Sequence, residues 1–305
     1  MATTVTVTSN YRGKVAGEIM GKSYMEIDTL SKGLVEVLPN INFKANLRKI
    51  AYTNGRQAYS CGFTPTGTIA LTEKVLTPKK FKVELQICKE DFRQTWSEDG
   101  FGASAWNKNM ATDIKDAIVA EVLASNAQQI ALDIWNGNNT ALQFNGLIPQ
   151  MKADANVVKP TAVAITTSNV MAELGKVVTA IPLALQRENL EFLISADVAN
   201  AYSLALVTAG YNNGLGGNAN TGLVFGRFNL TVVNELPANT IVVYKKGNLV
   251  MATGLQADFN EIQVVDEDEI GLMTGQVRFK MVFNGDTGYY NSEDIVLYNY
   301  VAPAG

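Results

Sequence analysis

Histidine is absent from the 305-residue sequence, and cysteine occurs only twice, at Cys61 and Cys88. Without histidine the chain cannot carry Ser-His-Asp or Cys-His catalysis, imidazole metal ligands or a histidine pH switch. Two cysteines cannot form a disulfide framework and are more typical of reduced thiols in a protein made in a cytosol. We expect neither a signal peptide nor a membrane span, because the N-terminus lacks a basic and an apolar segment and no apolar run reaches about 18 residues.

Charge is also scarce. Charged residues make up 18% of the sequence and hydrophobic residues 47%, and the formal net charge is −4. This composition is typical of a globular protein with a sizeable core and argues against a disordered chain. It also disfavours a strongly basic protein that reads nucleic-acid sequence.

The pattern of strands and helices indicates an α+β fold without repeats. Residues 1–40 have no helical period and are interpreted as an extended arm with little core of its own. Two strands on either side of the turn sequence CGFTPTG predict a projecting hairpin within 41–90. A 3.6-residue apolar period predicts a long helix over about 106–136. Helices and strands alternate over 138–255, and strands return over 256–305.

Three sequence patterns could carry chemistry, and each has a plainer structural interpretation. Residues 214–219 fit Gly-x-Gly-x-x-Ala, but a helix precedes them and a strand follows, which is the reverse of a dinucleotide-binding fingerprint. The acidic run 266–269 lacks the spacing of a calcium loop and is interpreted as a solvated or partner-facing loop. The pairs Glu90-Asp91 and Glu98-Asp99 show no converging partner for acid-base work. We therefore predict no catalytic, cofactor-binding or metal-binding residues.

Charge is segregated along the chain. Nine basic and two acidic residues lie between Phe43 and Lys89, a net charge of +7, so the remainder carries −11. Residues 258–269 hold acidic charges only. A basic hairpin and a distant acidic segment would suit a contact between identical subunits, whereas solubilising charge and a DNA-binding hairpin are the alternatives. The candidate contact residues are Lys44, Arg48, Lys49, Arg56, Lys79, Lys80 and Lys82 on the basic side and Asp258, Glu261, Asp266, Glu267, Asp268 and Glu269 on the acidic side.

The order of these parts resembles the major capsid protein of tailed double-stranded-DNA bacteriophages. The local sequence is similar as well, in KEDFRQTW before the long helix, ALDIWNGNNTALQFNGLIPQM at its end and FGRFNLTVVNELP further on. The resemblance implies an N-terminal arm over 1–40, an extended β-hairpin loop over 41–90 and an axial domain over 138–255. A peripheral domain with a spine helix of about 30 residues would comprise 91–137 and 256–305.

The resemblance implies a structural protein without catalytic activity or cofactor. Hexamers and pentamers of the chain would form the icosahedral shell of a virion, made in the cytoplasm of the host bacterium. The shell would enclose packaged double-stranded DNA, contacted on the inner face without sequence specificity. A portal and a separate scaffolding protein would be further partners, and no membrane would be involved. The alternatives are a nanocompartment shell protein of the same fold and, further off, a small-molecule enzyme on an α+β scaffold.

Overall fold

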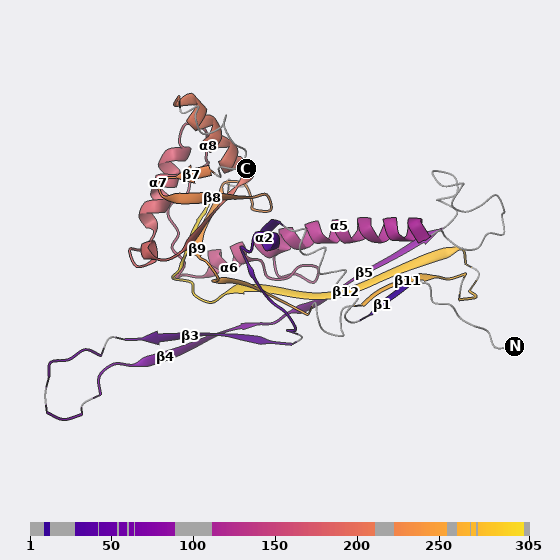
Figure 1. The fold of residues 1–305 in the computed structure, drawn as a ribbon, viewed down its shortest axis with the longest axis horizontal. Helices are drawn as coiled ribbons and strands as arrows, with labels where there is room; N and C mark the ends of the chain where they lie inside the picture. Colours follow the sequence, from indigo (N-terminus) through magenta and orange to yellow (C-terminus); the bar gives the residue numbers. More distant parts are fainter. Residues whose placement is uncertain are drawn as a thin grey trace.

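The computed structural model shows an elongated molecule with a projecting hairpin at one end and the turn between strands β11 and β12 at the other (Figure 1). It describes residues 9–12, 28–41, 43–53, 55–59, 61–63, 65–88, 112–210, 223–254, 261–268, 270–272 and 274–301. The strands form two larger sheets and one two-stranded ribbon. Helices alternate with these strands along the chain, which confirms the predicted α+β class.

The first sheet is built on the long strand β12 (Gln276–Tyr289). It pairs antiparallel with β5 (Lys79–Cys88), β11 (Glu261–Asp266) and β10 (Leu249–Thr253). The short strands β1 (Ser9–Arg12) and β2 (Glu36–Leu38) extend the sheet beyond β11 and β10. Apolar side chains of β12 alternate toward one face, so this sheet needs a partner layer on that side.

That layer is the predicted long helix, α5 (Thr112–Asn136), which runs along the sheet (Figure 1). Ile130 and Ile134 are 2% and 0% exposed, as the apolar period predicts, and Gln128 faces outward. The predicted first turns, 106–111, lie outside the described residues. The helix is therefore confirmed over the 25 residues that the structure assigns to it.

The second sheet has two covered faces. Its strand order is β13 (Ile295–Asn299), β9 (Thr240–Lys245), β6 (Leu190–Ser195), β8 (Phe228–Val233) and β7 (Leu223–Phe225). Helices α7 (Val170–Ala180) and α8 (Ala196–Thr208) pack on one face, where Ile241 and Val243 are buried. Val242 and Tyr244 face the opposite way, into the same core as Trp135 of α5. Burial on both sides explains why β9 reads as a continuous apolar run and not as an alternating one.

Two strands, one on each side of residue 255, pair with strands from the other side of that position. β10, expected with the axial segment 138–255, pairs with β12 in the first sheet. β13, expected with the peripheral segment 256–305, pairs with β9 in the second sheet. The chain thus crosses between the sheets twice near its end, and a division at 255 does not coincide with the division between sheets.

Residues 28–38 of the predicted arm pack into the main core of the subunit. Residues 28–38 contain α2 (Asp28–Ser31) and β2, and Leu30, Leu34 and Val35 are buried in the main core. Trp135 Nε1 donates to Thr29 Oγ1 at 2.9 Å, and the Tyr244 hydroxyl donates to the Leu34 carbonyl at 2.6 Å. The arm was expected to have little core of its own, and residues 28–38 are held in the main core by partners from strands and helices more than a hundred residues away.

The predicted hairpin exists but is shorter than expected. β3 (Ala45–Tyr52) pairs antiparallel with β4 (Ile69–Leu76), and this pair is called the ribbon below. The expected return strand breaks at Thr77-Pro78, since proline cannot donate a ladder hydrogen bond. After the break, β5 pairs with β12 and not with β3. Lys79, Lys80 and Lys82 therefore lie on the first sheet and not on the ribbon.

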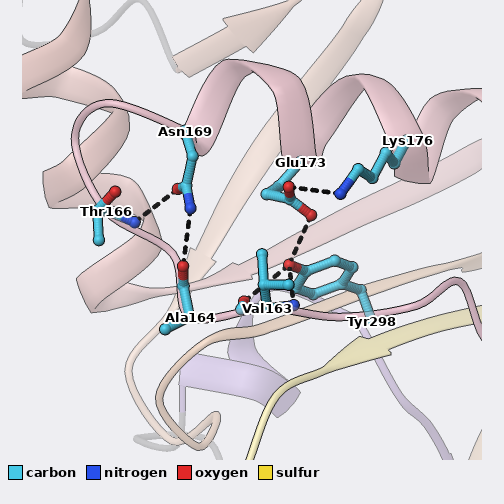
Figure 2. A network of polar contacts seen from close by, with 7 residues as sticks. All are labelled: Val163, Ala164, Thr166, Asn169, Glu173, Lys176 and Tyr298. Atoms are coloured by element: carbon cyan, nitrogen blue, oxygen red, sulfur yellow. Dashed lines mark hydrogen bonds and ion pairs between the residues drawn. The ribbon is translucent and has the colours of Figure 1, made fainter.

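The segment that leads into α7 is fixed by a network of polar contacts around the Tyr298 hydroxyl and Asn169 (Figure 2). The Tyr298 hydroxyl lies 2.9 Å from both Glu173 Oε2 and the Val163 carbonyl oxygen and accepts from the Val163 N–H at 2.9 Å. Lys176 Nζ pairs with Glu173 Oε1 at 2.7 Å. Burial, together with Glu173, raises the pKa of Tyr298 to about 12, so its proton stays in place at neutral pH. Asn169 then closes the turn through the Thr166 N–H and the Ala164 carbonyl.

Two glycines join the end of α5 to α6 (Leu147–Ala153). The Gly146 N–H donates to the Gly137 carbonyl at 2.8 Å. A Cβ on Gly137 would lie 2.4 Å from the Phe144 carbonyl oxygen, and one on Gly146 would lie 2.3 Å from the Gly137 nitrogen. Because both obstacles are backbone atoms, neither can move aside without displacing the chain.

We predict that Gly146→Ala destabilises the fold by at least ~2 kcal/mol, because the methyl group must displace backbone. The matched control is Gly175→Ala in the middle of α7, where an added Cβ meets nothing within 4 Å. That change should stabilise the helix by ~0.5–1 kcal/mol. Denaturant unfolding followed by circular dichroism measures both. Equal effects of the two variants would contradict the close approach at Gly146.

Candidate assembly interface

The ribbon carries an exposed apolar face. In its register Ile50 lies opposite Leu71, and Tyr52 lies opposite Ile69, so these four side chains share one face. Together with Val75 on the same face, they are 49 to 69% exposed. An Arg48–Glu73 ion pair of 2.8 Å crosses the face between them. Large apolar side chains gathered on a thin projecting ribbon are typical of a surface that another molecule covers.

The opposite face of the ribbon is attached to the body at its root. Leu47 and Leu76 are buried against Val250 and Ala252 of β10. Lys49 Nζ donates to Asn291 Oδ1 at 2.7 Å and pairs with Glu293 at 3.2 Å. Just after β4, the Thr77 N–H donates to Asp286 Oδ2 at 2.8 Å. The ribbon therefore leaves the body in a direction that its own chain fixes.

Lys74 belongs to the same root. Its ammonium lies 3.2 Å from the centre of the Tyr289 ring, in cation-π contact. Burial lowers the pKa of Lys74 to about 8, although the carboxylates of Asp154 and Asp286 act in the opposite direction. Burial also raises the pKa of Asp286. Burial acts to raise the pKa of Asp154, but hydrogen bonds from Asn156 and Tyr289 and the charge of Lys74 lower it overall.

Most of the predicted basic contact residues have partners inside the chain. On the ribbon, Arg48 and Lys49 form the ion pairs given above, and Lys44 lies 5.6 Å from the centre of the Phe43 ring. Arg56 lies between the two ribbon strands in sequence and is exposed. On β5, Lys79 donates to the carbonyls of Asn139 and Thr140, and Lys82 pairs with Glu84 at 2.8 Å. Lys80 is exposed on β5, opposite Asn284 in the register.

Two of the predicted acidic residues are buried within their own chain. Asp266, the last residue of β11, and Glu267, the first residue of the turn that follows, are each 1% exposed. Asp266 Oδ1 accepts from the Asp268 N–H at 3.1 Å, Asp268 Oδ1 accepts from the Gly275 N–H at 2.9 Å, and Glu267 pairs with Arg278 and Thr274. The expectation of a solvated acidic loop is thus wrong for these residues, whose carboxylates close their own turn. Glu261 begins β11, while Asp258 and Glu269 lie outside the described residues.

The exposed apolar face was not among the predicted site residues, although the sequence carries a signal for it. Ile50, Tyr52, Ile69 and Leu71 recur at every second position on both sides of the turn sequence. Once β3 and β4 are aligned about that turn, the period of two places them together. The basic residues of the segment 43–89 outnumber these four apolar residues, so the charge pattern is the more prominent signal in the sequence.

Two kinds of feature are absent from the described residues. Among them, no three His, Cys, Asp or Glu side chains come together as metal ligands. No helix in the described part of the chain is both long and apolar enough to cross a membrane.

The buried acidic turn gives a prediction about charge reversal. Changing Asp266 and Glu267 to lysine should destabilise the fold by ~3 kcal/mol or more, because two buried carboxylates that accept hydrogen bonds are replaced by unpaired ammonium groups. The control is Glu121→Lys, on the exposed side of α5, which should change stability by less than ~0.5 kcal/mol. Thermal unfolding measures both, and a double reversal as stable as the control would contradict the burial of this turn.

Sequence comparison alone does not place the chain. No protein-family model matches it, and no curated protein matches it.

Solved structures do match over nearly the whole length. The capsid protein of a native GTA particle is 13% identical, with 99% of this chain and 95% of that chain covered and a TM-score of 0.58. The capsid protein of cyanophage A-1(L) is 13% identical over 90% and 93% of the two chains, with a TM-score of 0.56. A virus-like particle from Pyrococcus furiosus is 11% identical over 94% and 99%, with a TM-score of 0.51.

These matches cover 90 to 99% of the chain, whose order of parts resembled a capsid protein in the sequence. The resemblance is thus confirmed at the level of the fold. The chain has the fold of the major capsid proteins of tailed bacteriophages.

Proposed function

We propose that this chain is the major capsid protein of a tailed phage, which assembles with copies of itself into an icosahedral shell around packaged double-stranded DNA. The observation that carries the proposal is a capsid fold matched over nearly the whole chain, together with a ribbon whose apolar face is uncovered in the single subunit. A shell protein needs extended surfaces that neighbours cover and no catalytic group. The ribbon is such a surface.

The ribbon supports assembly for a physical reason. A two-stranded ribbon buries little of its own surface and is marginally stable in water by itself. Covering Ile50, Tyr52, Ile69, Leu71 and Val75 would remove apolar surface from water at ~25 cal/mol per Å². In a closed shell the same gain is repeated at every subunit, because each ribbon would lie on the next copy in a heterologous contact.

The charged candidate residues contribute less to the proposed subunit contact than the sequence suggested, because several of them form ion pairs within their own chain. Lys44, Arg48 and Arg56 lie on or beside the ribbon and would take part in the contact, whereas Lys49 lies on the opposite face and is held by Asn291 and Glu293. Lys79, Lys80 and Lys82, on the first sheet, would meet a different part of a neighbour. Of the acidic candidates, Asp258, Glu261 and Glu269 are the ones we keep for a contact with the basic ribbon.

The remaining parts of the proposal concern partners and location. Subunits would form hexamers and pentamers in the shell of a virion, assembled in the cytoplasm of a bacterial host. A portal and a separate scaffolding protein would take part, and DNA would be contacted on the inner face without sequence specificity.

The second candidate is the shell of a protein nanocompartment, which the likeness to the Pyrococcus furiosus virus-like particle favours. The two functions differ in what the shell encloses. Particles purified from infected or expressing cells, imaged by electron microscopy and tested for nuclease-protected DNA and for enclosed protein, distinguish them. Protected genome-length DNA supports the phage capsid, and an enclosed enzyme supports the nanocompartment. A chain that stays monomeric at high concentration, with and without scaffold, contradicts both.

The ribbon face gives a direct test of assembly. Ile50→Asp with Leu71→Asp should reduce the yield of shells at least ~10-fold, because two charges on the covered face would each lose hydration on contact. The control is Ala51→Asp with Ala70→Asp, a pair that is also exposed and lies opposite in the register on the other face of the same strands. Circular dichroism should show both subunits folded.

Shell yield is measured by sedimentation and electron microscopy. The Ala51/Ala70 control should assemble like the parent, and the Ile50/Leu71 variant should not. This outcome would show that the apolar face of the ribbon, and not the ribbon in general, forms the subunit contact. Normal shells from the Ile50/Leu71 variant would overturn the assignment of this face to a subunit contact.

A further inference from the structure

The outer edge of β13 is paired over only part of its length. Val158 pairs with this edge in parallel, since its N–H donates to the Ile295 carbonyl at 3.1 Å and its carbonyl accepts from the Leu297 N–H at 2.9 Å. The next donor in this register would be Pro160, which carries no N–H. The pairing therefore stops at Leu297, although β13 continues to Asn299.

Three backbone groups of β13 lie at the open part of this edge. In an antiparallel pair, residues that bond to the neighbouring strand alternate with residues whose N–H and C=O point outward. The Tyr300 N–H donates to the Asn239 carbonyl at 3.2 Å, on the β9 side, so Asn299 points the other way. Within the described part of the chain, the Leu297 carbonyl and the N–H and carbonyl of Asn299 have no hydrogen-bond partner. An open edge of this kind is a template for a further strand.

A hollow of about 490 Å³ lies against the open edge. Leu297, Tyr300 and Val301 line one side of it, and Pro160 and Ala162, where the paired segment turns away, line the other. These side chains form an apolar lining beside the unpaired backbone. A strand added to a sheet edge gains affinity from main-chain hydrogen bonds and specificity from such a pocket for its side chains.

The charge beside the hollow is positive. Lys152 and Lys159 line it and are exposed, and Lys159 Nζ donates to the Lys152 carbonyl at 2.7 Å. The described residues that line the hollow include no carboxylate. Asp154 feels the charge of Lys159, but it is not part of the lining and accepts from the Tyr289 hydroxyl at 2.9 Å. Two ammonium groups at the hollow therefore favour a negatively charged partner.

We propose that the open end of β13 is a strand-addition site for an extended, acidic segment of a partner protein. The backbone of the segment pairs with Leu297 and Asn299, its apolar side chains enter the hollow, and its carboxylates meet Lys152 and Lys159. All of these groups belong to one subunit. The site therefore goes beyond the proposed function and can be tested on the subunit before any shell forms.

Peptide binding to the isolated, full-length subunit tests the site. The probe is a blocked, fluorescently labelled peptide of alternating valine and glutamate, and its counterpart carries lysine in place of glutamate. Fluorescence anisotropy measures the dissociation constant of each peptide. We expect the glutamate peptide to bind at least ~10-fold more tightly than the lysine peptide. Equal affinities, or no binding of the glutamate peptide, would overturn the proposal.

Two double charge reversals separate the site from the net charge of the subunit. Lys152→Glu with Lys159→Glu should weaken binding of the glutamate peptide at least ~10-fold. The matched control is Lys80→Glu with Lys280→Glu, at exposed positions of β5 and β12 in the first sheet. The control changes the net charge equally and should leave the affinity within about twofold, because screening limits the reach of distant charges. Equal losses in the two variants would contradict a local site.

N-methylated peptides test the backbone pairing without any change to the subunit. Methyl groups on every second nitrogen remove the donors along one edge of the probe, and the complementary set removes those along the other edge. Because the site fixes one direction of the added strand, only one edge meets β13, and one isomer should lose at least ~10-fold in affinity relative to the other. The amide signal of Asn299 should shift in the NMR spectrum when the parent peptide binds. Equal affinities of the two isomers, or an unchanged Asn299 signal, would contradict strand addition.

Small anions and nucleic acid are the other ligands that two lysines can hold. Inorganic phosphate and a short oligothymidylate are therefore added to the bound glutamate peptide at equal concentration. Neither should displace it, because neither offers peptide groups to the open edge or apolar side chains to the hollow. Displacement by either one would show a site for phosphate groups and would overturn the assignment to a protein segment.

Discussion

The structure depends on one strand, β12, which carries three antiparallel partners and also seats the ribbon. Asp286 accepts the hydrogen bond that ends β4, and the Tyr289 ring supports Lys74. Gly288 lies between them, where a Cβ would come 2.5 Å from Leu76 Cδ2. A side chain at that position would have to displace the Leu76 side chain, which packs the root of the ribbon on the sheet. The same strand that organises the core therefore also sets the direction of the projecting part.

The sequence predicts those elements whose stabilising contacts are periodic and local. The long helix follows from its apolar period, and Ile130 and Ile134 are buried as expected. The ribbon turn follows from its glycine and proline residues. β5 could not be assigned in this way, since the alternation of Phe81, Val83 and Leu85 suits a hairpin return strand as well as a sheet strand. Its actual partner is β12, about 190 residues further along the chain, and no local pattern reveals such a pairing.

Burial of polar residues is harder still to foresee. Asp266 and Glu267 read as a solvated run because four acids stand together, but Asp266 accepts from the Asp268 N–H within the run, and Glu267 is paired with Thr274 and Arg278 on the far side of the turn. Likewise, the sequence of residues 28–38 suggests an extended arm. In the fold, Trp135 donates a hydrogen bond to Thr29 and Tyr244 donates one to Leu34, and these contacts hold the segment in the core. In each case the sequence shows the polar group or the short segment, and only the fold shows what surrounds it.

The placement of charges changes the physical basis of the proposed assembly. Arg48, Lys49 and Lys82 already have acidic partners in their own chain, at 2.8 to 3.2 Å. Charges satisfied in this way add little attraction to a neighbour, and exposed ion pairs contribute only ~0–1 kcal/mol each. The uncovered apolar side chains of the ribbon have no such internal partner among the described residues. The subunit contact at the ribbon should therefore be mainly hydrophobic, with charge setting which surfaces meet, and it should weaken on cooling more than on adding salt.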